Sequence, residues 1–194
     1  MSAFNVFMIG VGGQGIGLLS EVLVRAADAA GLAVVGCDTH GLAQRGGTVV
    51  SHLRIGAGAH SPLVEEGTAD LVLALERHEA LRALHAMLRD GGALAWYDTS
   101  WQPLDVRLGI AAEVSPADIE AAASARGVRH YRVLVPDLDD PRQQNVAVLA
   151  TAARLRLVPG LEAHHYEQAL CDLLDGRALE ANMALLRRLA AGSR

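Results

Sequence analysis

Six residues that follow the first apolar run have the spacing of a phosphate-binding glycine loop. Gly10-Val11-Gly12-Gly13-Gln14-Gly15 satisfies G-x-G-x-x-G between an expected strand and an expected helix. Glycines at such a turn let backbone amides meet a phosphate at the positive end of the helix. Asp38 lies 28 residues after Gly10 and could bind a ribose hydroxyl, although the usual fingerprint places this acid about 20 residues on. Two interpretations stay open, namely nicotinamide dinucleotide binding and a purely structural turn.

A second candidate segment is the stretch His40–Gly47, H-G-L-A-Q-R-G-G, with Thr48 after it. In a doubly wound sheet this stretch would leave the second strand at its carboxyl edge, where open α/β sheets bind ligands. Gly46-Gly47 would allow close backbone approach, while Gln44 and Arg45 would offer an amide and a charged fork suited to carboxylate or phosphate. Alternatively, the glycines only turn the chain and Arg45 pairs with a neighbouring carboxylate.

Several kinds of chemistry are excluded by composition. All 17 basic residues are arginine, so lysine Schiff bases, a Walker-type lysine and a lysine general base are impossible. Cys37 and Cys171 are far apart without CxxC spacing, and two cysteines cannot hold a zinc ion or an iron–sulfur cluster alone. His78 and His85 are seven residues apart and lack the i, i+4 spacing of a helical metal site. No G-x-S-x-G elbow occurs.

The first half of the chain alternates strand and helix patterns. Phe4–Ile9 predicts a buried strand, and apolar residues at helical spacing from Ile16 to Ala30 predict a helix that stops at Gly31. Ala33–Cys37 is expected to be a second strand that completes a βαβ unit by parallel pairing. The stretch before the strand Val49–Ile55 is too short for a helical crossover, so we expect this third strand to be antiparallel and the sheet to be mixed.

The second half continues the alternation and then becomes helical. We expect strands at 71–75, 93–97, 106–110 and 129–135, with a helix from about Arg77 to Arg89 that Gly91 and Gly92 close. Ser115, Pro116 and Asp118 predict a capped helix that ends near Gly127. From Gln143 onward three helical stretches are expected, separated at 159–160 and near 176.

These patterns predict a three-layer Rossmann-like α/β fold with a mostly parallel sheet and a helical C-terminal segment. The 194 residues suit one domain spanning 1–194. No apolar run approaches the roughly 18 residues of a membrane span, and no targeting pattern precedes the first strand, so a cytoplasmic location is expected. A net charge of −5 with scattered arginines argues against nucleic acid as a partner.

Together, the two glycine segments resemble a known family. G-V-G-G-Q-G at 10–15, H-G-L-A-Q-R-G-G-T-V at 40–49 and S-H-L-R at 51–54 are similar to the gamma-type domain of the 2-oxoacid:ferredoxin oxidoreductases. The form of the second motif resembles the small subunits of indolepyruvate:ferredoxin oxidoreductases in particular. Downstream the similarity rests on Gly91-Gly92 and on Asn145. The chain has Leu149-Ala150 where the family often has Leu-Gly.

The resemblance implies a subunit of an assembly that oxidatively decarboxylates aryl 2-oxoacids, with coenzyme A as acyl acceptor and ferredoxin as electron acceptor. Thiamine diphosphate, magnesium and iron–sulfur clusters would belong to a large partner subunit, since this chain has no G-D-G…N-N segment. No residue is expected to be catalytic. The residues expected to shape the subunit interface, or to contact the coenzyme A or substrate side of the joint site, are Gly10, Gly12, Gly13, Gln14, Gly15, Gln44, Arg45, Gly46, Gly47 and Thr48.

Overall fold

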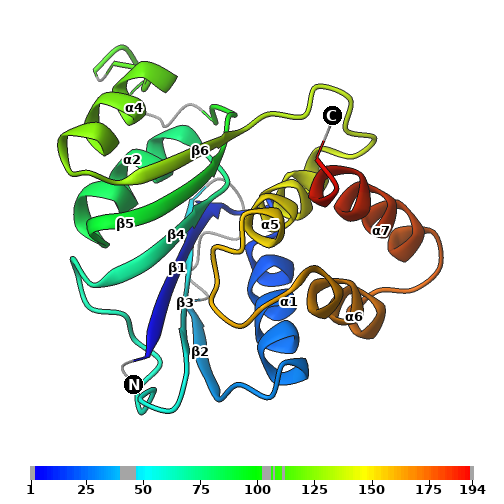
Figure 1. The fold of residues 1–194 in the computed structure, drawn as a ribbon. Helices are drawn as coiled ribbons and strands as arrows, with labels where there is room; N and C mark the ends of the chain where they lie inside the picture. Colours follow the sequence, from blue (N-terminus) through cyan, green and yellow to red (C-terminus); the bar gives the residue numbers. More distant parts are fainter. Residues whose placement is uncertain (1–2, 40–46, 102–105, 107, 111, 193–194) are drawn as a thin grey trace.

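The computed structural model describes residues 3–39, 47–101, 106, 108–110 and 112–192, and these build one mixed sheet between two helical layers (Figure 1). The strands are β1 (Phe4–Val11), β2 (Val34–Thr39), β3 (Thr48–Ile55), β4 (Ala69–Ala74), β5 (Leu88–Tyr97) and β6 (Arg129–Val133). The helices are α1 (Ile16–Ala29), α2 (Arg77–Ala86), α4 (Pro116–Ala125), α5 (Gln144–Arg154), α6 (Ala163–Leu173) and α7 (Gly176–Ala190), with a 3-10 turn η1 (Pro141–Gln143) before α5.

The sheet order is β2-β3-β1-β4-β5-β6. Strands β1, β4, β5 and β6 are parallel, whereas β3 runs antiparallel to both β1 and β2. The expected antiparallel third strand is therefore confirmed. The expected parallel pairing of the first two strands is wrong, because β3 lies between them. A short connection brings β3 back along β2, and β3 then pairs with β1 over its whole length, from Phe4↔Ile55 to Val11↔Thr48.

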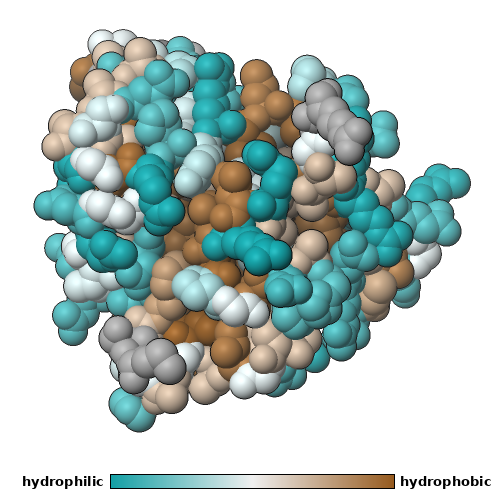
Figure 2. Space-filling model, viewed as in Figure 1, coloured by the Kyte–Doolittle hydropathy of each residue, from teal (hydrophilic) through white to brown (hydrophobic). Residues whose placement is uncertain are grey.

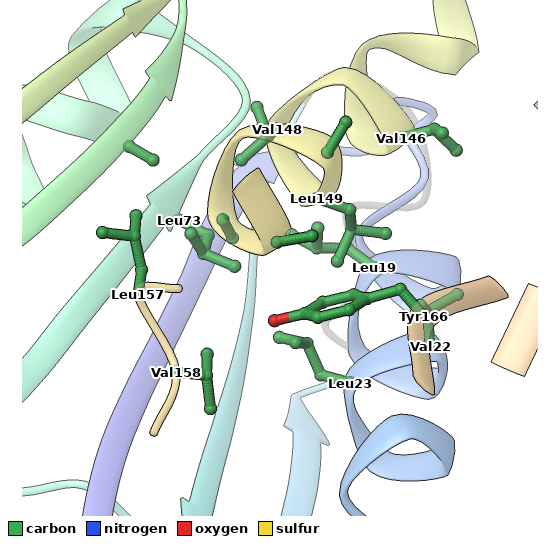
Figure 3. Packing of buried hydrophobic residues seen from close by; sticks show 14 of the residues in the cluster. Leu19, Val22, Leu23, Leu73, Val146, Val148, Leu149, Leu157, Val158 and Tyr166 are labelled. Atoms are coloured by element: carbon green, nitrogen blue, oxygen red, sulfur yellow. The ribbon is translucent and has the colours of Figure 1, made fainter. Parts of the chain in front are cut away.

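Alternating strand residues divide the core into two clusters, one on each face of the sheet. In β4, Leu71 and Leu73 belong to the cluster under α1, α5, α6 and α7, whereas Val72 and Ala74 belong to the cluster under α2 and α4. Figure 3 shows the first cluster, in which Leu19 and Leu23 of α1 face residues of α5 and Tyr166 of α6. The three-layer fold is confirmed, with the C-terminal helices on one face.

Local signals located α1, α4 and the three C-terminal helices correctly. The helix α4 begins as expected, because Ser115 and Asp118 form a reciprocal capping box and Pro116 occupies the first turn. Gly31 and Gly127 follow α1 and α4 with φ of 69° and 62°, the left-handed conformation that ends many helices.

The expected helix end at Gly91 and Gly92 is wrong. The helix α2 ends at Ala86, and both glycines lie inside β5. Ala69 pairs with Leu88 but Leu71 pairs with Ala93, so two steps along β4 match five along β5, which bulges at this point. A Cβ on Gly92 would lie 2.9 Å from Leu88 Cδ1 and 3.1 Å from Asp70 O. Close packing inside a bulge, and not the end of a helix, requires glycine here.

The expected strand at 106–110 is also wrong for its described residues. Residues 106 and 108–110 do not lie in a strand, and Leu108 and Ile110 are 62% and 73% exposed. The strand β6 pairs with β5 instead, and the described residues of this apolar stretch lie outside the sheet. None of the helices in the described ranges is long and apolar enough to cross a bilayer.

Candidate functional site

The two glycine segments meet at the carboxyl end of β1. The Gly12 amide donates a hydrogen bond of 2.9 Å to the Gly47 carbonyl, which extends the pairing of Val11 with Thr48 by one step. The first and second glycine segments, which are far apart in the sequence, are thus joined by the pairing of β1 with β3. Gln44, Arg45 and Gly46 lie outside the described residues.

Gln14 holds the glycine turn in place. Its side chain is 1% exposed. Its Oε1 accepts from the Val11 amide at 2.7 Å, and its Nε2 donates to the Leu75 carbonyl at 3.0 Å, so it ties the end of β1 to the end of β4. A Cβ on Gly10 would lie 2.9 Å from that same Oε1. Gly10 and Gln14 therefore shape the turn from inside, and both polar atoms of the Gln14 amide are occupied by backbone partners.

Gly13 and Gly15 need glycine for different reasons. Gly15 has a φ of 84°, and a Cβ there would lie 2.4 Å from Asn145 Nδ2, whose hydrogen bond to the Gly15 carbonyl measures 3.1 Å. Gly13 has a φ of 103°, and among the described residues no heavy atom lies within 4 Å of the position of a Cβ. Asn145 at the start of α5 thus fixes the far side of the turn, and the exposed backbone of Gly13 faces open space.

That open space is a cavity of about 520 Å³ at the carboxyl ends of the parallel strands. Open α/β sheets bind ligands in this position. The cavity lies between the glycine turn, the end of β5 and the connection from β6 to α5. Its lining residues are Gly13, Gln14, Tyr97, Asp98, Thr99, Trp101, Leu134, Val135, Pro136, Leu138, Asp140, Pro141, Arg142 and Gln144.

Thr48 links the second motif to α2. Its hydroxyl donates to Glu79 Oε1 at 3.0 Å. Glu79 is 4% exposed, and this burial raises the pKa of its carboxyl above the ordinary value, against the opposing effect of the Arg82 guanidinium. Its Oε2 lies 3.3 Å from Arg82 Nε as an ion pair but without hydrogen-bond geometry. The predicted Thr48 therefore contacts a buried acid that sequence reasoning did not single out.

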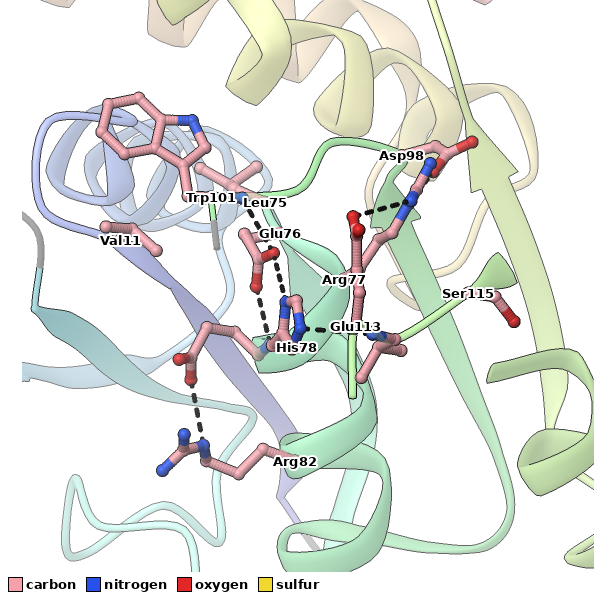
Figure 4. Close-up of polar contacts among 12 residues, drawn as sticks. Val11, Leu75, Glu76, Arg77, His78, Arg82, Asp98, Trp101, Glu113 and Ser115 are labelled. Atoms are coloured by element: carbon pink, nitrogen blue, oxygen red, sulfur yellow. Dashed lines mark hydrogen bonds and ion pairs between the residues drawn. The ribbon is translucent and has the colours of Figure 1, made fainter. Parts of the chain in front are cut away.

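A glutamate–histidine pair at the start of α2 was also missed (Figure 4). Glu76, 1% exposed, accepts from the Glu79 amide at 3.0 Å as the helix cap and from the Trp101 amide at 3.1 Å. Its Oε1 also lies 2.9 Å from His78 Nδ1, and His78 Nε2 accepts from the Val114 amide at 3.2 Å. This pattern fits a neutral imidazole that carries its proton on Nδ1. The pair thus fastens both ends of the stretch 101–114.

Asp98, at the end of β5, is the cavity's buried charge. Its side chain is 2% exposed and pairs with both Arg77 and Arg132; Arg132 Nε donates to its Oδ2 at 2.6 Å. Figure 4 shows Arg77 reaching Asp98 from the first turn of α2. The arginines supply the compensation that a buried carboxylate needs. Only the sheet order brings these three residues together, so no sequence spacing could have indicated them.

The geometry argues against dinucleotide binding through Asp38. Its carboxylate accepts hydrogen bonds from Ser51 and, at 3.1 Å, from Ser20. It lies on β2, which is separated from β1 by β3. In the dinucleotide fingerprint the acidic residue ends a strand adjacent to the glycine-loop strand. Asp38 instead fastens α1 to the β2–β3 edge.

The described residues do not fit a metal cluster or an iron–sulfur centre. No group of three or more His, Cys, Asp or Glu side chains in the described ranges could hold a metal ion. Cys37 lies on β2 and Cys171 is exposed on α6. Two thiolates on separate elements cannot replace the four ligands of a cluster.

Comparison with known proteins agrees with this architecture. The family model of pyruvate ferredoxin/flavodoxin oxidoreductase matches residues 5–191. The indolepyruvate oxidoreductase subunit IorB of Archaeoglobus fulgidus is 34% identical over 197 aligned residues, covering 94% of this chain and 92% of that protein. The subunit of the same name from Methanothermobacter thermautotrophicus is 32% identical, covering 95% and 94%.

Solved structures show the same fold at lower identity. The pyruvate oxidoreductase subunit PORC of Thermotoga maritima superposes with a TM-score of 0.64 at 19% identity, covering 98% of this chain and 97% of that one. The 2-oxoglutarate:ferredoxin oxidoreductase of Magnetococcus marinus, solved with 2-oxoglutarate, coenzyme A and succinyl-CoA bound, gives 0.66 at 16% identity, and the match covers 100% of this chain but 32% of that longer one. The family model over residues 5–191 and the two IorB relatives show that the chain belongs to the pyruvate ferredoxin/flavodoxin oxidoreductase family.

Proposed function

We propose that this chain is the small subunit of a 2-oxoacid:ferredoxin oxidoreductase whose substrate is indolepyruvate or a related aryl pyruvate. Similarity to the IorB subunits over more than nine-tenths of both chains is the observation that supports this most strongly. The relatives are named for different acids, indolepyruvate, pyruvate and 2-oxoglutarate, which share a carboxylate beside a ketone. Preference among aryl side chains would be set mainly by a pocket on the partner.

The chemistry is divided between two polypeptides in this proposal. Thiamine diphosphate, magnesium and iron–sulfur clusters belong to the large subunit, which supplies decarboxylation and electron transfer to ferredoxin. This chain alone is inactive. One observation supports the division: the two cysteines of the sequence, Cys37 on β2 and Cys171 on α6, cannot supply the four thiolates of an iron–sulfur cluster.

The small subunit contributes a shaped glycine-rich edge to the joint site. The residues proposed for it are the glycine turn from Gly10 to Gly15, together with Gln44, Arg45, Gly46, Gly47 and Thr48. Their junction through Gly12 and Gly47, next to a 520 Å³ cavity, supports a role at the coenzyme A or substrate side of the joint site, or at the subunit interface. Exposed backbone at Gly13 and a guanidinium at Arg45 would suit phosphate or carboxylate groups.

Reconstitution tests the proposal. The purified chain is combined with a large subunit of this enzyme class from the same organism, and dye reduction is measured with indolepyruvate and coenzyme A. Activity should require both subunits and both substrates. Turnover by the isolated chain, or a redox group that stays bound to it, would overturn the division of labour.

Arg45→Ala then tests whether the second motif contributes to the joint site. Turnover of the complex should fall while the unfolding curve of the subunit stays unchanged. Arg25→Ala, which removes an exposed arginine from the solvent side of α1, is the matched control and should leave turnover intact. Equal activity of the two variants would count against a role for the second motif.

A further inference from the structure

The mouth of the cavity carries exposed hydrophobic side chains. Trp101 and Leu134 are 51% and 56% exposed, and both line the cavity. Two prolines and a leucine of the β6–α5 connection continue this apolar lining. We call these residues the carboxyl-edge rim: Trp101, Leu134, Pro136, Leu138 and Pro141. Figure 2 shows hydrophobic residues reaching the surface between the part of the molecule that contains β5 and β6 and the part that contains α5 and α7.

The rim is held in a fixed geometry. The Trp101 amide donates to the fully buried Glu76, and Figure 4 shows the indole extending away from that carboxylate. Next to Leu134, the Val135 carbonyl accepts from the buried Tyr97 hydroxyl at 3.0 Å. Side chains on a backbone that is already ordered lose less entropy when a partner covers them. Trp101 and Leu134 should therefore lose little conformational entropy when a partner binds over them.

The charged residues that line the cavity beside the rim are already paired. Asp98 is held between Arg77 and Arg132, and Arg142 pairs with Asp140 at 2.6 Å. The remaining surface is aromatic and aliphatic, which is the composition of an interface centre depleted of charged residues. Such a surface fits an apolar surface of a partner protein.

From these observations we infer that the carboxyl-edge rim is the docking surface for the large subunit, an inference that rests on the proposed function. The Magnetococcus marinus protein supports this occupant, because the matching fold takes up about a third of a longer chain and so occurs there beside further protein. The rim is also continuous with the cavity that Gly13 and Gln14 line. Docking at the rim brings the partner to the glycine turn and closes the cavity between the two subunits.

Two leucines of equal exposure give a matched test. Leu134 and Leu63 are both 56% exposed, but Leu63 lies in the β3–β4 connection and is not among the residues that line the cavity. Leu134→Asp should weaken binding to the purified large subunit about tenfold or more, because it places a charge in an apolar contact. Leu63→Asp should change the dissociation constant less than about twofold. Calorimetric titration measures both, after thermal unfolding shows that each variant is folded.

Tryptophan fluorescence gives a second, independent readout. The chain has two tryptophans, Trp96, which is fully buried, and Trp101. Iodide should quench Trp101 in the free subunit and lose most of that quenching in the complex. The Trp101→Phe variant, which keeps Trp96, gives the background, and a large subunit with its tryptophans replaced by phenylalanine keeps the signal specific.

The outcomes separate the inference from the proposed function. If the wild-type chain does not bind the large subunit, both are overturned. If the wild-type chain binds, but Leu134→Asp binds as tightly as Leu63→Asp and iodide quenches Trp101 equally in the free and the bound subunit, only the docking surface is overturned. If Leu134→Asp instead dissociates a self-associated small subunit and leaves the affinity for the large subunit intact, the occupant is a second copy and the inference is wrong.

Discussion

Replacing Gly15 by alanine should destabilise the fold more than replacing Gly13, the other glycine of the turn with a positive φ. A left-handed φ costs a non-glycine residue about 1–2 kcal/mol. The new Cβ would also lie 2.4 Å from Asn145 Nδ2 and 3.3 Å from its Cγ. Asn145 is 3% exposed, so its displacement would break its hydrogen bond to the Gly15 carbonyl inside the protein. A buried donor left without its partner costs about 1–3 kcal/mol. The expected total is roughly 2–5 kcal/mol.

Two flanking glycines are the controls. Gly13→Ala places a Cβ in open space at a φ of 103° and should cost only backbone strain, about 1–3 kcal/mol. Gly17→Ala, in the first turn of α1 with no described heavy atom within 4 Å of the new Cβ, should be neutral or stabilise the protein by up to about 0.5 kcal/mol because alanine favours helix. Urea unfolding of the three variants gives the order directly.

A double-mutant cycle tests the cause. Asn145→Ala should destabilise the wild-type chain but cost much less in the Gly15→Ala background, where it removes the steric clash. If Gly15→Ala is no worse than Gly13→Ala, or if Asn145→Ala has the same effect in both backgrounds, contact between α5 and the glycine turn does not determine the requirement for glycine.

Three further changes have expected outcomes. Tyr166→Phe should raise the unfolding free energy by about 1 kcal/mol, because the buried hydroxyl of Tyr166 in the cluster of Figure 3 has no hydrogen-bond partner among the described residues. A lower stability in urea would contradict this. Glu79→Gln should gain stability relative to wild type as pH rises from about 4.5 toward neutrality. Burial raises the folded-state pKa of Glu79, so the unfolded chain loses its proton at lower pH than the folded chain, and wild-type stability falls as pH rises through that window. Parallel pH profiles of the two proteins would refute this. Ser115→Ala should cost about 1 kcal/mol through loss of the α4 capping box, and an unchanged melting temperature would be the contrary result.

Residues close together in sequence determined most of the helices. Ser115, Pro116 and Asp118 specify the start of α4 through contacts within one turn, so their spacing alone predicts it. The glycine turn between β1 and α1 was predicted for the same reason. The direction of β3, which lies beside the turn, could also be predicted. The connection from β2 to β3 is too short for a helical crossover, so β3 was expected to run antiparallel to β2.

Pairings between distant segments could not be obtained in this way. The insertion of β3 between β1 and β2 depends on which strands bury their faces together, and the same short connection is compatible with other sheet orders. Gly91 and Gly92 have the sequence pattern of a helix end, yet their role comes from the contact of β5 with β4. Likewise, Asp38 matched an expected acidic position, but only the positions of α1 and β3 show that Ser20 and Ser51 donate hydrogen bonds to its carboxylate.

The sequence by itself determined the α/β alternation, the glycine turn, the excluded lysine and cysteine chemistry and the family resemblance, because these depend on residue types and on spacings within single elements. Tertiary structure alone decided that Gly12 meets Gly47, that Asn145 holds Gly15 from 130 residues away, and that Asp98 lies between two arginines. Such contacts join elements whose order in the sheet is set by the burial of both faces at once, and no local pattern encodes that order.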